Sequence, residues 1–272
     1  MRQLAKIMGI LNVTPDSFSD GGRWVHDDAL DARIDQLIGE GADIIDVGGE
    51  STRPYAEPVS VEEELKRVIP VIGKIRKRSG IDISIDTTKA VVARAALSAG
   101  ATMINDISAL QNDPQMIDVV KNYTGPVVVM HMQGTPEDMQ DRPKYDDVVA
   151  EINQFFAERI AWLERHGVGK SRIILDPGVG FGKILEHNID ILKNIQKFKQ
   201  QGCQVLVGHS RKSFIGQLLG LPVAERDCPT AILSVLCQQQ GVDILRVHNV
   251  ALSRQALLLD ASLNAVCTEA QA

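Results

Sequence analysis

The residues best suited to chemistry stand at the ends of short apolar runs that recur along the whole chain. Nine of them can carry charge or form several hydrogen bonds: Asn12, Asp46, Asp86, Asn105, His131, Asp176, Ser210, Arg246 and His248. A turn after a strand often begins with Asp or Asn, and this explanation covers one or two of the positions. It does not account for an Arg and a His within one apolar run. The pattern therefore indicates a shared polar site.

Three of these residues suit a flat, nitrogen-rich heterocycle. Asp86 and Asp176 supply carboxylates that can accept two hydrogen bonds from an amidine-like edge, and the amide of Asn105 can both donate and accept. In the run ISID, the alternation of side chains along a strand puts Asp86 on the same face as the small Ser84. We therefore expect these polar groups to line one end of a ligand site.

The run LRVH near the end of the chain indicates a second, anionic ligand group. Alternation turns Leu and Val to one face of the strand, and Arg246 and His248 together to the other. Two potentially cationic side chains on one face suggest an anion, and the guanidinium fork of Arg246 suits a phosphate. The alternative is a structural ion pair between Arg246 and either Asp176 or Asp86.

The stretch GHSRKSFIG (208–216) adds Ser210, Lys212 and Ser213 at the expected start of a helix. Free N–H groups and the helix dipole attract a further negative charge at such a position. The alternative is that Ser210 only caps the helix among surface cations. Together the strand ends predict a site with a heterocycle end, a phosphate end and a carboxylate end.

The glycine-rich stretch LDPGVGFGK (175–183) resembles a phosphate loop in composition only. A Walker A loop needs Gly where Pro177 stands and Ser or Thr where Ile184 stands. A dinucleotide fingerprint needs a third Gly where Lys183 stands. The stretch is therefore predicted to serve the site in another way, with Asp176 near its start.

An alternation of strands and helices must position these residues. The strand-like runs are KIMGILNV, ADIIDVG, IDISIDT, TMINDI, PVVVMHM, RIILDPG, QVLVGHS and DILRVH. Near-continuous Ile and Val runs of this kind are typical of parallel strands covered on both faces. They predict an α/β fold, a (β/α)8 TIM barrel with its site at the C-terminal ends of the strands, as one domain spanning residues 1–272. A doubly wound open sheet is the second choice.

Two helices have clear end signals. VEEELKRVIPVIGKI is preceded by Ser60, which should form a capping box with Glu63, and Pro70 should kink or split this helix. EINQFFAERIAWLERHG should end near Gly167, which stands where a helix commonly ends.

The bulk properties exclude several classes of partner. A net charge of −6 at pH 7 argues against nucleic acid or an anionic membrane. No stretch has the length of a membrane span and the start lacks a signal peptide's apolar region, so we expect a cytoplasmic protein. The four cysteines show no C-x-x-C pairing and are expected to be reduced thiols without a function.

With these motifs the chain resembles the dihydropteroate synthases of bacteria over nearly its full length. The resemblance rests on LNVTPDSFSDGG (11–22), DVGGESTRP (46–54), IDTTK (85–89), INDI (104–107), MHMQGTP (130–136), LDPGVGFGK (175–183), SRKS (210–213) and RVH (246–248). It implies a (β/α)8 barrel and a transferase of folate biosynthesis, the class that sulfonamides target. The implied reaction joins 6-hydroxymethyl-7,8-dihydropterin diphosphate to p-aminobenzoate, giving 7,8-dihydropteroate and diphosphate.

The resemblance also implies a role for particular residues. The implied pterin contacts are Asp86, Asn105, Asp176 and Lys212. The implied diphosphate contacts are Asn12, Arg246 and His248, and Asn12 is also the implied ligand of Mg²⁺. The implied p-aminobenzoate contacts are Thr52, Pro54, Phe181, Lys212 and Ser213, with Phe18 and Arg53 on loops that close over the site. The implied catalytic residues are Lys212, Arg246, His248 and Asp176.

The chemistry of this reaction leads to further expectations. The attacking aniline is a poor nucleophile and diphosphate is a good leaving group, so we expect a dissociative, SN1-like step. Mg²⁺ prefers phosphate oxygens and water, and should therefore bind weakly until diphosphate is present. The stretches TPDSFSDGG and GGESTRP have the composition of loops that close over a site, and should become ordered only with ligands.

Two other functions remain possible at this stage. Pterin-dependent methyltransferases share the barrel and the pterin carboxylates, but do not need Phe18, Arg53 or a diphosphate clamp. A non-catalytic pterin-binding module would not need the clamp either. The family further implies a homodimer. Asp46 either supports the metal from behind or is a structural turn residue, and Asn249 stands where the family commonly has Asp.

Overall fold

Eight short runs of mostly β-branched residues form parallel strands that close into a barrel in chain order, because β1 pairs with both β2 and β8. The computed structural model describes residues 4–13, 23–51, 57–135 and 138–269. The strands are β1 (Lys6–Asn12), β2 (Ile44–Gly48), β3 (Asp82–Asp86), β4 (Met103–Asp106), β5 (Val127–Met130), β6 (Ile173–Asp176), β7 (Gln204–Val207) and β8 (Ile244–Val247). The predicted barrel is confirmed and the open sheet is excluded.

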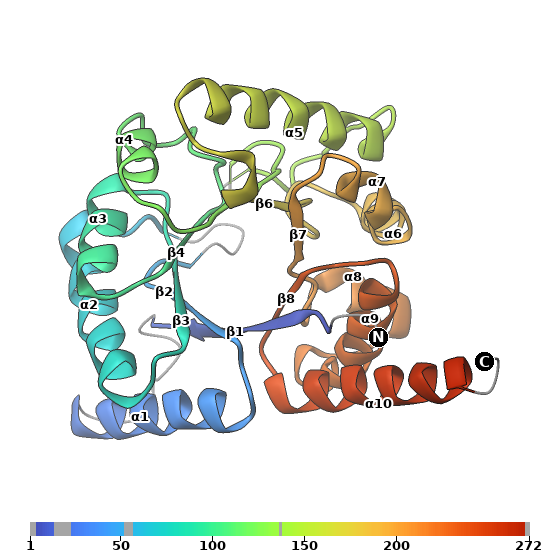
Figure 1. Ribbon diagram of the computed structural model, residues 1–272, viewed down its shortest axis with the longest axis horizontal. Helices are drawn as coiled ribbons and strands as arrows, with labels where there is room; N and C mark the ends of the chain where they lie inside the picture. Colours follow the sequence, from blue (N-terminus) through green and yellow to red (C-terminus); the bar gives the residue numbers. More distant parts are fainter. Residues whose placement is uncertain (1–3, 14–22, 52–56, 136–137, 270–272) are drawn as a thin grey trace.

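Helices form an outer ring around the barrel (Figure 1). They are α1 (Arg23–Gly39), α2 (Val61–Arg78), α3 (Ala90–Ala99), α4 (Met116–Lys121), α5 (Val148–Arg165), α6 (Leu185–Lys193), α7 (Ile195–Lys199), α8 (Ser213–Leu219), α9 (Asp227–Gln239) and α10 (Val250–Glu269). Short 3₁₀ turns lie at Lys170–Arg172 and Val223–Glu225. Within the described part of the chain, no helix has the length and apolar character needed to cross a membrane.

The alternation of side chains divides every strand between two cores. Outward-facing residues such as Ile45, Ile85 and Leu245 pack beneath the helices. The barrel interior is closed by a separate cluster: Met8, Ile44, Met103, Val128, Ile174, Leu206 and Ile244. Burial of one such side chain is worth about 1.5–3 kcal/mol. This cluster fills the inside of the barrel beneath the polar strand ends.

The helix α2 shows one predicted feature and contradicts another. The hydroxyl of Ser60 accepts a hydrogen bond from the Glu63 N–H at 3.2 Å, which is one half of the predicted capping box. The Glu63 carboxylate accepts from Nε of Arg67 at 3.0 Å. The helix runs unbroken from Val61 to Arg78 with Pro70 inside it, so the predicted split is wrong. Buried residues on either side of the proline, including Val68 and Ile72, hold the helix against the core despite the missing N–H.

The long helix α5 ends where the sequence indicates and begins earlier. It stops at Arg165, and Gly167 adopts a left-handed φ of 85°, as expected for a glycine after a helix. Its first residue is Val148, because the Asp147 carboxylate accepts hydrogen bonds from the N–H groups of Val149 and Ala150, each at 3.0 Å.

Candidate active site

The C-terminal ends of neighbouring strands bring the predicted polar residues to one end of the barrel. The strand pairings place Asn12 beside Gly48, Gly48 beside Asp86, and Asp86 beside Asn105. On the far side Asp176 pairs with Met130. The predicted inward direction of Asp86 follows from these pairings, because Gly48 and Asn105 lie on the same face of their strands.

Arg246 lies within an ion-pair network inside the barrel. Its Nε donates to Oδ2 of Asp46 at 2.6 Å, and its Nη2 donates to Oδ2 of Asp86 at 2.8 Å. The alternative pairing with Asp86 is therefore present in the structure. Asp46 lies within β2 and is fully buried, so its interpretation as a structural turn residue is wrong.

The network shifts the ionisation of its members in opposite directions. Burial raises the pKa of Asp86 to about 7, although the guanidinium of Arg246 opposes the shift. Burial alone would lower the pKa of Arg246, but the carboxylates of Asp46 and Asp86 more than compensate, so the pKa rises above its usual value. Arg246 therefore stays cationic, whereas Asp86 changes charge near neutral pH.

Asp176 and Lys212 face the same space from β6 and from the residue before α8. Burial raises the pKa of Asp176, whose Oδ1 accepts the Gly178 N–H at 2.8 Å. Burial, and then the charge of Arg246, lower the pKa of Lys212 to about 8. The Nζ atom of Lys212 lies 4.0 Å from the centre of the Phe181 ring. Lys212, which is predicted to contact both substrates, therefore lies against Phe181, which is predicted to contact p-aminobenzoate.

The structure corrects the predicted role of Ser210 and shows its contact with His248. The Ser210 hydroxyl lies 2.9 Å from His248 Nδ1 and accepts the His248 N–H at 3.2 Å. It does not cap the helix, because α8 begins at Ser213 with Lys212 as its N-cap. Burial and the neighbouring Arg211 lower the pKa of His248 to about 3. His248 is therefore neutral at pH 7 in the protein without a bound anion, and its potential positive charge is absent there.

The glycine-rich stretch 175–183 forms a tight loop after β6. A Cβ on Gly178, where φ is 65°, would lie 2.0 Å from the carbonyl oxygen of His131. The buried Nζ of Lys183 donates to the carbonyl oxygens of Phe181 at 2.8 Å and of His131 at 3.2 Å. Burial lowers the pKa of this amine to about 7. Gly178 therefore makes room for the backbone of the neighbouring loop.

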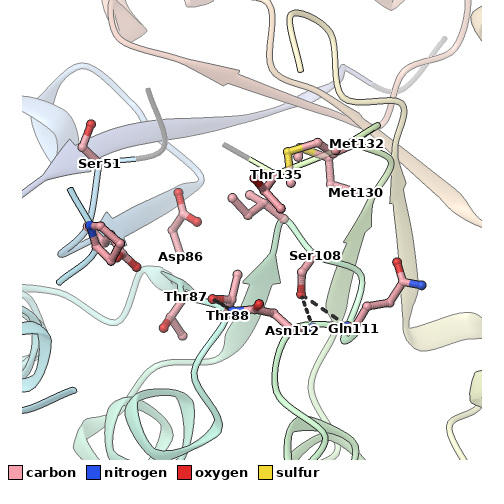
Figure 2. Close-up of a pocket in the computed structure, with 14 residues that line it drawn as sticks. Ser51, Asp86, Thr87, Thr88, Ser108, Gln111, Asn112, Met130, Met132 and Thr135 are labelled. Carbon is pink, nitrogen blue, oxygen red and sulfur yellow. Dashed lines mark hydrogen bonds between the residues drawn. The ribbon is translucent and has the colours of Figure 1, made fainter. Parts of the chain in front are cut away.

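Two cavities adjoin the network. One, of about 460 Å³, is lined by residues of the segments after β2, β3, β4 and β5, and Figure 2 shows Asp86 projecting into it between Ser51 and Met130. The other, of about 20 Å³, lies among Asp86, Asn105, Asp176, Lys212 and Arg246. The smaller space has room for about one water molecule, and the contact between Arg246 and Asp86 lies on its wall.

Asn12 fits the implied magnesium site only together with a phosphate ligand. Its Oδ1 is a hard oxygen donor at the end of β1, 3.7 Å from the position that a Cβ on Gly48 would take. Among the described residues no group of three or more His, Cys, Asp or Glu side chains could hold a metal. Such a donor set suits an ion that keeps its waters and binds substrate phosphate.

Several predicted residues lie outside the part of the chain that the structure describes. They are Phe18, Thr52, Arg53 and Pro54, together with most of the two predicted loops. Of the remaining p-aminobenzoate residues, Phe181 is nearly buried against Ile107 and Met130, and Ser213 is exposed at the start of α8. The predicted change in loop order therefore remains a prediction.

Two sets of contacts in the site were not predicted from the sequence. Asp46 contacts both Arg246 and Asn105, whose Nδ2 lies 3.2 Å from Asp46 Oδ2. The signal was available, because alternation in IIDVG turns Asp46 to the same face as Gly48. The buried Lys183 was considered only as a failed phosphate-loop lysine. Its contacts with backbone carbonyls depend on the folded loop and have no pattern in the sequence.

The fold and the site together define a class of enzyme. A family model described as pterin binding enzyme matches residues 8–248. The chain therefore belongs to the pterin-binding enzyme family.

Several relatives with high identity to this chain are dihydropteroate synthases. The dihydropteroate synthase of Escherichia coli (strain K12) is 48% identical over 262 residues, which are 95% of this chain and 92% of that protein. A dihydropteroate synthase of Xanthomonas albilineans, solved with 4-aminobenzoic acid, superposes with a TM-score of 0.91 at 45% identity and covers 96% of this chain and 94% of its own. The structure of the dihydropteroate synthase from the same species in complex with 7,8-dihydropteroate superposes with a TM-score of 0.88 at 42% identity. It covers 97% of this chain and 95% of its own.

Proposed function

We propose that this pterin-binding enzyme is a dihydropteroate synthase, which joins 6-hydroxymethyl-7,8-dihydropterin diphosphate to p-aminobenzoate and releases diphosphate. One observation carries the proposal. The carboxylates of Asp86 and Asp176, the amide of Asn105 and the guanidinium of Arg246 line one small space at the strand ends. The high identity to relatives solved with p-aminobenzoate and with 7,8-dihydropteroate supports the choice of substrates.

The carboxylates recognise the pterin. Asp176 is 7% exposed and keeps one oxygen on Gly178, so its other oxygen can accept from ring N–H groups. Asp86 becomes available once Arg246 leaves it, and Asn105 can donate and accept beside it. Charge-assisted hydrogen bonds of this kind are about twice as strong as neutral ones, which favours a ring that becomes cationic.

The diphosphate end is formed by Arg246, His248 and Asn12. Arg246 contributes a permanent charge, and His248 contributes a hydrogen bond as a neutral imidazole fixed by Ser210. Bound Mg²⁺, with Asn12 as its protein ligand, would neutralise the charge that grows on the leaving diphosphate. Stabilisation of developing charge is commonly the largest catalytic contribution, and loss of one donor typically costs about 3–4 kcal/mol.

The chemical step follows from this distribution of charge. Cleavage of the C–O bond to diphosphate runs ahead of attack by the amine, because the site stabilises both the leaving anion and a cationic pterin. Lys212 and Phe181, in contact at 4.0 Å, position the p-aminobenzoate and do not activate it. The step is therefore dissociative and SN1-like, without an important general base.

A turnover assay separates this proposal from its rivals. With both substrates the enzyme should form 7,8-dihydropteroate and diphosphate in equal amounts, and this turnover should disappear in Asp176→Asn. A pterin-dependent methyltransferase or a binding module would bind a dihydropterin without releasing diphosphate, which would exclude the proposal. Of the two rivals, neither requires the cation Arg246 at the mouth of the barrel.

The exposed apolar residues of three helices support a homodimer. Seven large side chains, each between 47% and 63% exposed, lie on α8, α9 and α10: Leu218, Leu219, Ile232, Leu236, Leu258, Leu259 and Leu263. The helices α9 and α10 lie side by side in Figure 1. Apolar surface of this kind marks a protein interface, and a second copy of the chain is the proposed partner. The free thiols of Cys203, Cys228 and Cys237 support the proposed cytoplasmic location.

A further inference from the structure

Asp46 is a buried carboxylate that the proposed reaction does not use. It lies on the inner face of β2 and is fully buried. Its Oδ2 accepts hydrogen bonds from Nε of Arg246 at 2.6 Å and from Nδ2 of Asn105 at 3.2 Å. These partners come from β8 and β4, and belong to the diphosphate end and the pterin end of the site. Hydrogen bonds therefore connect Asp46 to a residue of the diphosphate end and to a residue of the pterin end.

The two carboxylates that hold Arg246 differ in their access to a ligand. The side chain of Asp86 is 9% exposed and lines both cavities, whereas that of Asp46 is 0% exposed and lines neither. A pterin can therefore replace the Asp86–Arg246 bond of 2.8 Å. It cannot reach the bond between Asp46 and Arg246.

We infer that Asp46 is a positioning residue, which holds Arg246 through Nε and Asn105 through its amide while the pterin takes Asp86. Nε lies on one edge of the guanidinium, so this bond leaves the terminal Nη1–Nη2 edge for a phosphate. The inference deepens the proposed function and rests on its assignment of Arg246 to the diphosphate.

The charge of Asp46 matters as much as its position. A buried guanidinium that loses its counter-charge is strongly disfavoured. When Asp86 turns to the pterin, Asp46 remains as the carboxylate in contact with Arg246. Without it, the guanidinium would keep hold of Asp86 and would oppose pterin binding. The two ligand ends would then compete for one carboxylate.

Binding of inorganic diphosphate with Mg²⁺ tests the inference without the chemical step. In calorimetry on the full chain, D46N should weaken diphosphate binding by about tenfold or more, as removal of outer-shell partners does elsewhere. R246A should weaken it at least as much. The double variant D46N/R246A should match R246A within twofold, because Asp46 acts through Arg246.

Kinetics adds a result that a merely structural role would not produce. D46N should raise KM for the dihydropterin diphosphate and lower kcat, while KM for p-aminobenzoate stays within twofold of the parent. The matched control is D106N, because Asp106 is equally buried at the end of β4 and its carboxylate accepts from the N–H and the hydroxyl of Ser108, not from Arg246 or Asn105. D106N should leave diphosphate binding unchanged.

Three results would overturn the inference. A diphosphate affinity of D46N within twofold of the parent would exclude an anchoring role. A loss of affinity in D46N/R246A equal to the sum of the losses in the two single variants would exclude it as well. If D46N does not fold, D46N/R246M is compared with R246M, and a further tenfold loss there would show that Asp46 does not act through Arg246. A parent that binds diphosphate but does not turn over both substrates contradicts the proposed function, and the binding data then decide the role of Asp46 alone.

Discussion

Single residues set the pH range in which this site can work. Asp86 must be a carboxylate to accept from the pterin, and its pKa of about 7 means that this form appears as the pH rises through neutrality. Lys212 must be an ammonium, and its pKa of about 8 means that this charge is lost soon afterwards. The productive combination of charges is therefore most populated between these two transitions.

We predict a bell-shaped pH dependence of kcat/KM for the dihydropterin diphosphate, rising near pH 7 and falling near pH 8. Because the groups interact, the two limbs belong to the network as a whole. Rates from pH 5.5 to 9.5 measure the profile, and Lys212→Arg should remove the basic limb, since its guanidinium keeps its charge. A flat profile across this range would contradict the assignment of charges.

Asp176 tests recognition of the heterocycle. Asp176→Asn should weaken pterin binding by about 2–4 kcal/mol, because an amide replaces one acceptor by a donor that faces ring N–H groups. Calorimetry with a dihydropterin ligand measures the loss, and Asp106→Asn is the control. An affinity for the Asp176 variant within threefold of the parent would exclude direct contact.

The order of bond breaking can be tested with the nucleophile. We expect single-turnover rates at saturation to be nearly independent of amine basicity across ring-substituted p-aminobenzoates, because the amine attacks after the C–O bond has opened. Arg246→Ala should slow every member of the series alike. A steep dependence on basicity would indicate direct displacement instead.

At the scale of elements, the loop after β6 shows how backbone conformation supports the site. Gly178 brings its N–H to the carboxylate of Asp176 and its α-carbon against the carbonyl of His131. Lys183 then holds the carbonyl of Phe181 from beneath. One short turn thus fixes both the carboxylate of Asp176, which is proposed to bind the pterin, and the ring of Phe181.

Gly178→Ala should destabilise the fold and weaken pterin binding together. Backbone strain alone costs about 1–3 kcal/mol for a side chain at positive φ, and the added Cβ would lie 2.0 Å from the His131 oxygen. Gly73→Ala is the matched control, because it lies inside α2 with nothing within 4 Å of the added Cβ. It should stabilise the protein by up to about 1 kcal/mol. Urea denaturation compares both, and equal stabilities would contradict the contact.

At the scale of the whole molecule, the barrel separates the site from the proposed dimer face. The site opens at the C-terminal strand ends, whereas the exposed apolar side chains lie on the outer ring, on α8, α9 and α10. Catalysis and dimerisation can therefore be altered independently by substitutions. This separation makes the oligomeric state testable without damage to the catalytic residues.

Leu259→Glu combined with Leu263→Glu should convert a dimer into monomers, because these leucines are 63% and 62% exposed and charge would be buried at the interface. Sedimentation velocity measures the change. Val91→Glu is the control, since Val91 is 49% exposed on α3, on the other side of the ring. A monomeric parent, or a dimer insensitive to both leucines, would exclude this face.

The sequence by itself determined the barrel and most of the residues that gather at its mouth. Ile- and Val-rich runs require cover on both faces, and this requirement together with their number leads to a closed parallel barrel. Alternation then decides which side of each strand faces inward, so the directions of Asp86 and Arg246 followed from their neighbours in the chain. Both inferences use only local periodicity.

The tertiary structure decided which of these groups touch and what charge they carry. Asp46 meets Arg246 across 200 positions of sequence, Ser210 holds His248 instead of capping a helix, and Pro70 remains inside an unbroken helix. The neutrality of His248 comes from burial and from nearby cations. Such contacts and charges depend on distances between strands that closure of the barrel sets, and no local pattern in the sequence contains those distances.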